Sequence, residues 1–237
     1  MIMGIMQPYF FPYLGYFSLI KATDKWIVFD ISQYEKYSWM YRNRILKLCN
    51  GNWMYINVPI NKHPLNTAMN RIHIHDQQKW ESKIIAQMGY YQKHAPYYSN
   101  VIGFLKEVLK PKFLNLSKLN IHTLKETCAY IGLNFNYEVY SKMDINIEAV
   151  NSADEWGLNI CRALGVTEFI NPEGGQQFID RKKYSRKGIN LKFLEYGYKP
   201  YNQKRDVFIP GLSILDAMMF NSPSEIYQML DDYQLVR

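Results

Sequence analysis

The sequence predicts an α/β protein: a Rossmann-like parallel sheet in its N-terminal part, a helical middle segment and a further α/β C-terminal part. Three observations support this class. An apolar run at residues 2–6 stops at Gln7-Pro8, apolar residues at helical spacing follow, and a second apolar run occupies residues 26–29. Strand, loop, helix and strand in this order are typical of a parallel βαβ unit. Helical spacing then prevails over about residues 77–132.

The helix of the first unit is expected to begin near Pro12, because proline suits the first turn of a helix. Leu14, Phe17 and Ile20 follow it at helical spacing. Gly15 lies among them and would let the helix approach a ligand or the sheet closely.

The segment after the second strand is less regular. Residues 40–48 suit either a helix or a strand, and Asn50-Gly51 predicts a hairpin turn into a strand at residues 53–58. Residues 71–75 alternate between polar and apolar side chains, which predicts another strand.

Prolines and glycines divide the rest of the chain. Helices are expected at residues 77–94, 97–110, 114–132, 149–164, 213–220 and 224–230, and strands at residues 135–140, 168–170 and 189–196. Ser152 and Glu155 have the spacing of a capping box, and Gly165 suits the C-terminal cap of the same helix. Since no repeat or low-complexity linker interrupts residues 1–237, we expect a single domain, with the helical part at about 77–132 as a subdomain or insertion.

The composition excludes several classes of protein. Of 237 residues, 48% are hydrophobic and 16% aromatic, which excludes a disordered chain. Lys and Arg number 28 against 21 Asp and Glu, a net charge of +7 that favours an anionic ligand. Because no nucleic-acid fold motif is present, we favour a phosphate-bearing small molecule over a polymer. A merely solvated basic surface is the alternative.

The N-terminal twenty residues are largely uncharged but do not predict an export signal. No basic residue precedes them, and Pro8 and Pro12 interrupt them. No apolar run is long enough to span a bilayer. The three cysteines, Cys49, Cys128 and Cys161, are far apart and form no CxxC pair. We therefore expect a cytoplasmic protein.

The loop after the first strand is the most informative candidate site. In open α/β sheets, ligands bind at the carboxyl ends of strands and near helix N-termini. Gln7 and the aromatic residues Tyr9 to Tyr16 lie there. The alternative is that these aromatic rings simply pack a core.

Two neighbouring segments carry charged candidates. Asp30 ends the second strand, so its carboxylate would lie at the same sheet edge as Gln7, with Gln33 close behind. It could equally be a helix cap or a turn residue. Arg42 and Arg44 flank Asn43, and guanidinium groups suit phosphate or carboxylate ligands.

The remaining candidates carry less information. His73 and His75 would share one face of a strand, with Asp76 adjacent, but two histidines make a weak metal site. Gly174-Gly175 follows a short strand and could expose backbone N–H groups to an anion, or be a plain turn. Asn202 and Asp216 are polar residues in weaker C-terminal segments.

Together, these residues resemble the WbqC-like family over nearly the whole chain. The resemblance depends on an ordered set of short motifs: Gln7-Pro8, Phe11 to Phe17, Asp30, Gln33-Tyr34, Arg42 to Ile45, Gly174-Gly175, Gly188-Ile189, Tyr201 to Gln203, Phe208 to Pro210 and Leu212 to Asp216. Two positions depart from the family pattern. Met6 stands where relatives usually carry a histidine, and Ile31 where they often carry a second aspartate. Any chemistry that needs this histidine would fall to other residues.

The resemblance implies a role in bacterial surface-polysaccharide (O-antigen) biosynthesis. The implied reaction transfers an amino acid, glycine in particular, onto the amino group of a nucleotide-linked amino-deoxy sugar. Asp30, Gln7 and Arg42 are the expected catalytic residues. The expected substrate-binding residues are Tyr9, Tyr16, Gln33, Asn43, Arg44, Gly174, Gly175, Asn202 and Asp216. No metal is expected, and the only further component is an activated aminoacyl donor, for which aminoacyl-tRNA would account for the basic charge.

Two other functions stay open. The first strand, loop and Leu14-Gly15-Tyr16 are similar to the opening of nucleotidylyltransferases, which implies an enzyme that activates an acid or a sugar with a nucleotide. The 20 tyrosines and five tryptophans would also suit a non-catalytic glycan-binding or scaffold protein.

Overall fold

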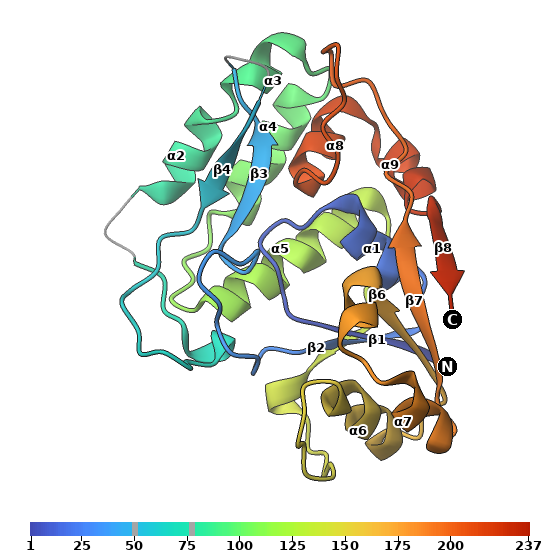
Figure 1. The fold of residues 1–237 in the computed structure, drawn as a ribbon. Helices are drawn as coiled ribbons and strands as arrows, with labels where there is room; N and C mark the ends of the chain where they lie inside the picture. Colours follow the sequence, from blue (N-terminus) through green and yellow to red (C-terminus); the bar gives the residue numbers. More distant parts are fainter. Residues whose placement is uncertain (49–51, 76–78) are drawn as a thin grey trace.

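The computed structural model describes residues 1–48, 52–75 and 79–237. A six-stranded sheet lies at its centre, in the order β5-β2-β1-β6-β7-β8 (Figure 1). The strands are β1 (Ile2–Met6), β2 (Lys25–Val28), β5 (Tyr137–Val139), β6 (Glu168–Pro172), β7 (Asn190–Tyr196) and β8 (Tyr233–Val236). Neighbouring strands are parallel except for β7 and β8, which are antiparallel. The predicted α/β class with a parallel sheet is confirmed.

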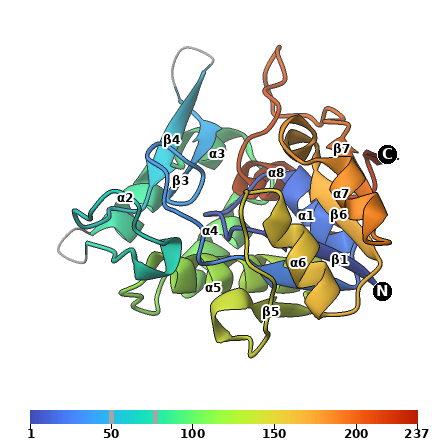
Figure 2. The same cartoon turned by 60° about the horizontal axis from the view of Figure 1, so that its bottom comes forward.

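Helices cover both faces of this sheet (Figures 1 and 2). Met3, Ile5 and Ile27 pack toward α6 (Glu155–Ala163) and α7 (Arg181–Arg186), whereas Trp26 and Val28 belong to the larger core on the opposite face. The helices of that face are α1 (Leu14–Lys21), α5 (Leu116–Ile131), α8 (Ile214–Phe220) and α9 (Pro223–Met229). Burial on both faces explains why β1 and β2 are continuous apolar runs.

A second part, built on a two-stranded antiparallel sheet, packs against this face. It comprises β3 (Arg42–Leu46), β4 (Trp53–Asn57), α2 (Trp80–Ala86), α3 (Gly89–His94) and α4 (Tyr98–Val108), with a short 3₁₀ turn at η1 (Met69–Arg71). Two further 3₁₀ turns follow strands of the six-stranded sheet: η2 (Tyr140–Lys142) comes after β5 and η3 (Glu173–Gln177) after β6. One cluster of buried side chains runs from the central sheet through α1, β3, α4 and α5. The middle segment therefore shares its core with the rest of the chain.

Most predicted elements are present, with corrections. Residues 71–75 form no strand: Ile74 and His73 make only isolated bridges, and η1 precedes them. The predicted helix at 149–164 begins at Glu155, and its capping box is not formed, because the Ser152 hydroxyl bonds to Asp154 instead. The predicted helix at 77–94 is divided into α2 and α3. α7 and β8 were not predicted.

The predicted turn at Asn50-Gly51, the thiol of Cys49 and the carboxylate of Asp76 lie outside the described residues. Cys128 and Cys161 are buried free thiols, and burial raises the pKa of both. In the part of the chain that the structure describes, no helix combines the length and the apolar character that crossing a membrane requires.

Candidate functional site

A large cavity opens where the strand order of the sheet reverses. From β1 the chain continues to β2 on one side, whereas β6 lies on the other, and in doubly wound sheets ligands bind at this point beside the carboxyl ends of the strands. The first cavity has a volume of about 550 Å³ and is lined by Ile5, Met6, Gln7, Phe29, Ser32, Gln33, Val150, Asn151, Ser152, Ala153, Asp154, Trp156, Gly157, Phe169, Asn171, Phe178, Ile179 and Tyr184. Both predicted glutamines, Gln7 and Gln33, therefore lie in it.

The lining of the first cavity combines aromatic rings with amide groups. Phe29 packs against Trp156 with ring centroids 5.0 Å apart, and Phe178 is 59% exposed. Gln7, Asn151 and Asn171 supply amide donors and acceptors. Aromatic surface with a few polar groups is the usual lining of a small-molecule site.

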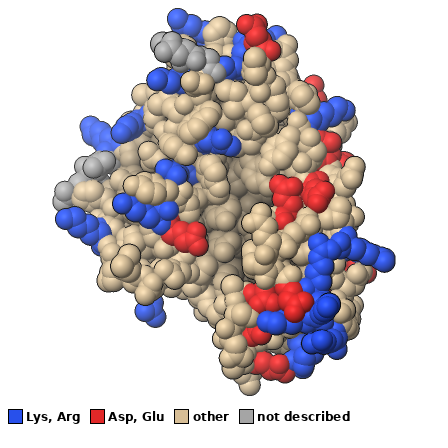
Figure 3. Space-filling view, viewed as in Figure 1, with Lys and Arg blue, Asp and Glu red and all other residues tan. Residues whose placement is uncertain are grey.

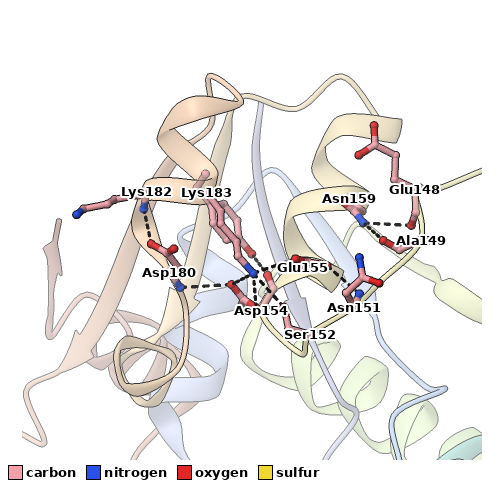
Figure 4. Close-up of polar contacts among 11 residues, drawn as sticks. Glu148, Ala149, Asn151, Ser152, Asp154, Glu155, Asn159, Asp180, Lys182 and Lys183 are labelled. Carbon is pink, nitrogen blue, oxygen red and sulfur yellow. Dashed lines mark hydrogen bonds and ion pairs between the residues drawn. The ribbon is translucent and has the colours of Figure 1, made fainter.

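One wall of the first cavity, residues 148–155, is held at both of its ends (Figure 4). Lys183 of α7 donates to Ser152 Oγ at 3.0 Å and to Glu155 Oε1 at 2.9 Å, and lies 3.2 Å from Asp154 Oδ2. At the other end, Asn159 Nδ2 donates to two backbone carbonyls of residues 148–149. The wall is thus anchored to both α6 and α7.

Ion pairing with Lys183 determines the charge states of the acidic side chains at this end of the wall. Burial opposes ionisation of Asp154, but hydrogen bonds from Ser152 and Lys183 outweigh it and lower the pKa of the carboxyl group. Hydrogen bonds to Lys183 and to the backbone of Asn151 lower the pKa of Glu155, and the same carboxylates raise the pKa of Lys183. At neutral pH, Asp154 and Glu155 are therefore carboxylates, and Lys183 is an ammonium group.

The loop of residues 7–13 leads from the first cavity to a second one. Buried side chains bond to its backbone carbonyls: Asn120 Nδ2 donates to Pro8 at 2.8 Å, and Asn43 Nδ2 donates to Phe10 at 3.1 Å and to Phe11 at 2.8 Å. The Tyr16 hydroxyl donates to the Gln7 carbonyl at 2.9 Å. Asn43 and Tyr16, predicted to bind substrate, are therefore buried residues that hold this loop.

A second cavity of about 230 Å³ lies beyond the loop, lined by Tyr9, Pro12, Tyr13, Trp39, Asn43, Arg44, Tyr198 and Gly211. Figure 3 shows that this face of the molecule is hollowed along its middle, between the β3–β4 part and the part formed by β6 and β7. Three predicted substrate-binding residues, Tyr9, Asn43 and Arg44, line the second cavity.

Arg44 is the cation of the second cavity. Its guanidinium group lies between the rings of Trp39 and Trp53, 5.3 and 5.2 Å from their centroids. One terminal nitrogen donates to the Gly211 carbonyl at 2.9 Å. Arg42, on the same face of β3, lies over the rings of Tyr37, Tyr41 and Tyr55 and lines neither cavity.

Stacked tyrosines form another part of the wall of the second cavity. The rings of Tyr13 and Tyr198 are 5.9 Å apart and nearly parallel, at 12°. A Cβ on Gly15 would lie 2.4 Å from the Tyr13 ring. The absence of a side chain at this position therefore lets the ring pack against the start of α1. Burial, with a smaller effect of Glu35, raises the pKa of Tyr9 to about 12, so that its hydroxyl stays protonated at neutral pH.

The structure places the other predicted residues outside both cavities. Asp30 is 3% exposed, and both of its oxygens accept hydrogen bonds from Ser141, at 3.0 Å from the backbone N–H and 2.6 Å from the hydroxyl. Asp216 is fully buried and accepts hydrogen bonds from Tyr91 and Tyr201. Both carboxylates tie elements of the fold together.

Gly174 and Gly175 belong to η3, beside the first cavity. A Cβ on Gly175 would lie 2.5 Å from Asn171 Oδ1, so this glycine makes room for an amide that lines the cavity. Asn202 is exposed, and its side chain accepts from the Lys204 backbone at 2.9 Å, as in a local turn.

Sequence reasoning missed the residues that other segments bring to the cavities. Asn151, Trp156, Asn171 and Phe178 face the carboxyl edge of the sheet from β6, α6 and the loops around them, and Tyr198 follows β7. The signal available for Asn171 was its position at the end of a short strand. His73 and His75 belong to no described group of three or more His, Cys, Asp or Glu residues that could hold a metal ion.

Fold and site together define a doubly wound α/β protein with a ligand-sized cavity at its topological switch point. The chain belongs to the WbqC-like protein family, whose model matches residues 7–228. It is similar to the uncharacterized protein Rv1507c of Mycobacterium tuberculosis, with 27% identity over 224 residues that cover 94% of each chain. No solved structure matches the chain significantly.

Proposed function

We propose that this protein is an enzyme of bacterial surface-polysaccharide (O-antigen) biosynthesis that transfers an aminoacyl group, such as glycine, onto the amine of a nucleotide-linked amino-deoxy sugar. Membership of the WbqC-like family suggests a protein associated with polysaccharide biosynthesis. The observation that carries the proposal is the first cavity at the switch point, where aromatic rings and amides lie side by side.

The lining of the first cavity suits a nucleobase or an aminoacyl group better than a chain of phosphates. No Lys or Arg is among its described lining residues, whereas Phe29, Trp156 and Phe178 offer faces for stacking. The phosphates of a sugar nucleotide need a cation, and Arg44 lies at the other end of the residue 7–13 loop. A substrate that spans the loop would contact both the aromatic and amide groups of the first cavity and the Arg44 cation of the second.

The reaction needs a group that accepts a proton from the attacking amine. We assign this role to Asp154, because it is the one carboxylate among the described residues that line the first cavity. Its lowered pKa makes it a weak base, suited to the acidic ammonium group formed once the amine has added to the acyl carbon. The amine nitrogen bonds to the carbonyl carbon, its proton passes to Asp154, and the bond to the donor's leaving group breaks, so that the leaving group departs with the electron pair and takes this proton from Asp154.

Asp30, predicted from sequence as the base, fits a supporting role in this proposal. Its two hydrogen bonds to Ser141 join the end of β2 to η2. Replacing each carboxylate separates the two assignments. Asp154→Asn should abolish turnover in a protein that still folds, whereas Asp30→Asn should chiefly lower the melting temperature.

A thermal-shift panel tests the proposal, with sugar nucleotides that carry or lack a sugar amine, nucleoside triphosphates and free glycine. A ligand at a hundred times its Kd adds about 2.7 kcal/mol of stability. We expect the amino-sugar nucleotide to raise Tm, and the product with an activated glycine donor to show the mass of a new amide. Stabilisation by a triphosphate alone, with pyrophosphate release, would instead identify an activating enzyme, and no shift with any sugar nucleotide would refute the proposal.

A further inference from the structure

The second cavity is separate from the first, and the two share none of their described lining residues. Its volume of about 230 Å³ is below the roughly 300–1,000 Å³ of drug-sized sites. It therefore admits a group about the size of one sugar ring. The residues that line it indicate which kind of sugar derivative would bind there.

Arg44 provides a cation that has no anionic partner among the described residues. The guanidinium group is half-buried and forms no ion pair with a described carboxylate; its Nε is buried and has no hydrogen-bond partner among the described residues. A half-buried guanidinium group without a carboxylate partner can pair with an anion that a ligand supplies. A phosphate oxygen matches a guanidinium group in both charge and geometry.

Aromatic rings surround this cation. Trp39 flanks the guanidinium group, and the stacked rings of Tyr13 and Tyr198 line the same cavity. The flat apolar faces of a sugar ring pack well on such rings, while its hydroxyls hydrogen-bond to tyrosine hydroxyls. A site for inorganic phosphate alone would not need these walls.

The backbone around the second cavity is held in strained conformations. Phe11 and Tyr198 both have positive φ, +41° and +52°, in a region that bulky residues rarely adopt. Ser213 Oγ and Asn43 Nδ2 both donate to the Phe11 carbonyl at 2.8 Å. Strain of this kind persists where the surrounding structure fixes it, and it is concentrated at ligand sites.

We infer that the second cavity is a subsite for a glycosyl phosphate: a single sugar ring whose anomeric phosphate is bound by Arg44 and whose ring packs on Tyr13, Trp39 and Tyr198. The inference rests on the proposed function: it assigns the sugar phosphate to this cavity and the aminoacyl group to the first, so that the sugar amine reaches across the residue 7–13 loop toward Asp154. It predicts that a hexose 1-phosphate binds without any nucleotide.

The test is isothermal titration of the full chain with glucose 1-phosphate, methyl glucoside and inorganic phosphate. Glucose 1-phosphate should bind at least tenfold more tightly than either of the others, because it alone meets both Arg44 and the aromatic walls. Arg44→Gln should weaken this binding about ten- to a hundredfold, the range for loss of a charge-assisted hydrogen bond. Arg186→Gln removes the same charge from the exposed surface of α7 and should leave binding unchanged.

Trp39→Leu is a second test, because Trp39 is 37% exposed and its loss does not endanger folding. It should weaken glucose 1-phosphate binding and leave Tm nearly unchanged. Equal affinity of the wild type and both variants, or a preference for inorganic phosphate, would overturn the inference. Failure of the transfer assay with glucose 1-phosphate still bound would refute the proposed function alone, and transfer without such binding would refute the subsite alone.

Discussion

The Tyr91 hydroxyl joins three elements of the fold through two buried hydrogen bonds. From α3, it accepts from the Leu46 backbone of β3 at 2.9 Å and donates to Asp216 Oδ1 of α8 at 2.6 Å. Tyr91→Phe keeps the buried ring but leaves the Leu46 N–H unpaired and Asp216 with one donor fewer. Each buried polar group left unpaired costs about 1–3 kcal/mol. We expect a loss of about 2–6 kcal/mol in the free energy of unfolding at neutral pH.

The loss should also depend on pH through Asp216. Burial raises the pKa of this carboxyl group from 3.8 to about 6, although Tyr201, Tyr91 and Gln203 donate hydrogen bonds that lower it. Because the folded pKa is the higher one, the stabilising contribution of Asp216 is full below pH 3.8 and is lost as the pH rises through about 6. Above that pH the Tyr91 bond goes to a charged acceptor, worth about 1 kcal/mol more than a neutral bond.

Urea denaturation of the wild type and Tyr91→Phe at pH 7.5 and pH 5 measures both effects. The cost of the substitution should fall by about 1 kcal/mol at pH 5. Tyr227→Phe is the matched control, because its ring is 39% exposed and its hydroxyl has no hydrogen bond among those described. A cost below 1 kcal/mol at pH 7.5, or a cost that grows on acidification, would refute the role given to this hydroxyl.

Four further substitutions each test a single feature of the structure. Gly157→Ala should destabilise the fold by about 1–3 kcal/mol in thermal denaturation, because its Cβ would lie 2.8 Å from buried aromatic side chains. Gly103→Ala, with no atom within 4 Å of its Cβ, should instead stabilise α4 by about 0.4–1 kcal/mol. Lys183→Met should weaken the loss of stability as the pH falls below 3.8, since it removes the ammonium group that lowers the pKa of Asp154; an unchanged acid transition would contradict this. Asn43→Ala should cost about 1–3 kcal/mol and weaken glucose 1-phosphate binding, and normal binding would show that the loop does not depend on this amide.

Local patterns in the sequence were enough to predict the first βαβ unit. Three local signals are present: the apolar run at residues 2–6, the proline-rich loop and the apolar run at residues 26–29. Each depends only on residues close in the chain, and β1, α1 and β2 form as expected. Residues 71–75 show the limit of such patterns. Ile72 and Ile74 are indeed buried, but among the described residues this segment makes only isolated bridges and no ladder with a neighbouring strand.

The candidate site could be predicted only in part, because it depends on the order of the strands. Gln7 and Gln33 follow β1 and β2, so a parallel pair was enough to place them at one edge. Asn171 and Trp156 reach the same edge only because β6 lies next to β1, a pairing between residues more than 160 positions apart in the chain. Asp216 looked like a helix acid in sequence, and only the packing of Tyr91 and Tyr201 shows it to be buried.

The loop of residues 7–13 has a consequence for how the two cavities act together. Its carbonyls at Gln7, Pro8, Phe10 and Phe11 already accept hydrogen bonds from protein side chains. The loop is therefore already ordered before a ligand binds in either cavity. A ligand in one cavity does not change the affinity of the other cavity by moving this loop. The two affinities should be thermodynamically independent, so that a ligand tethered across the loop gains by effective concentration alone.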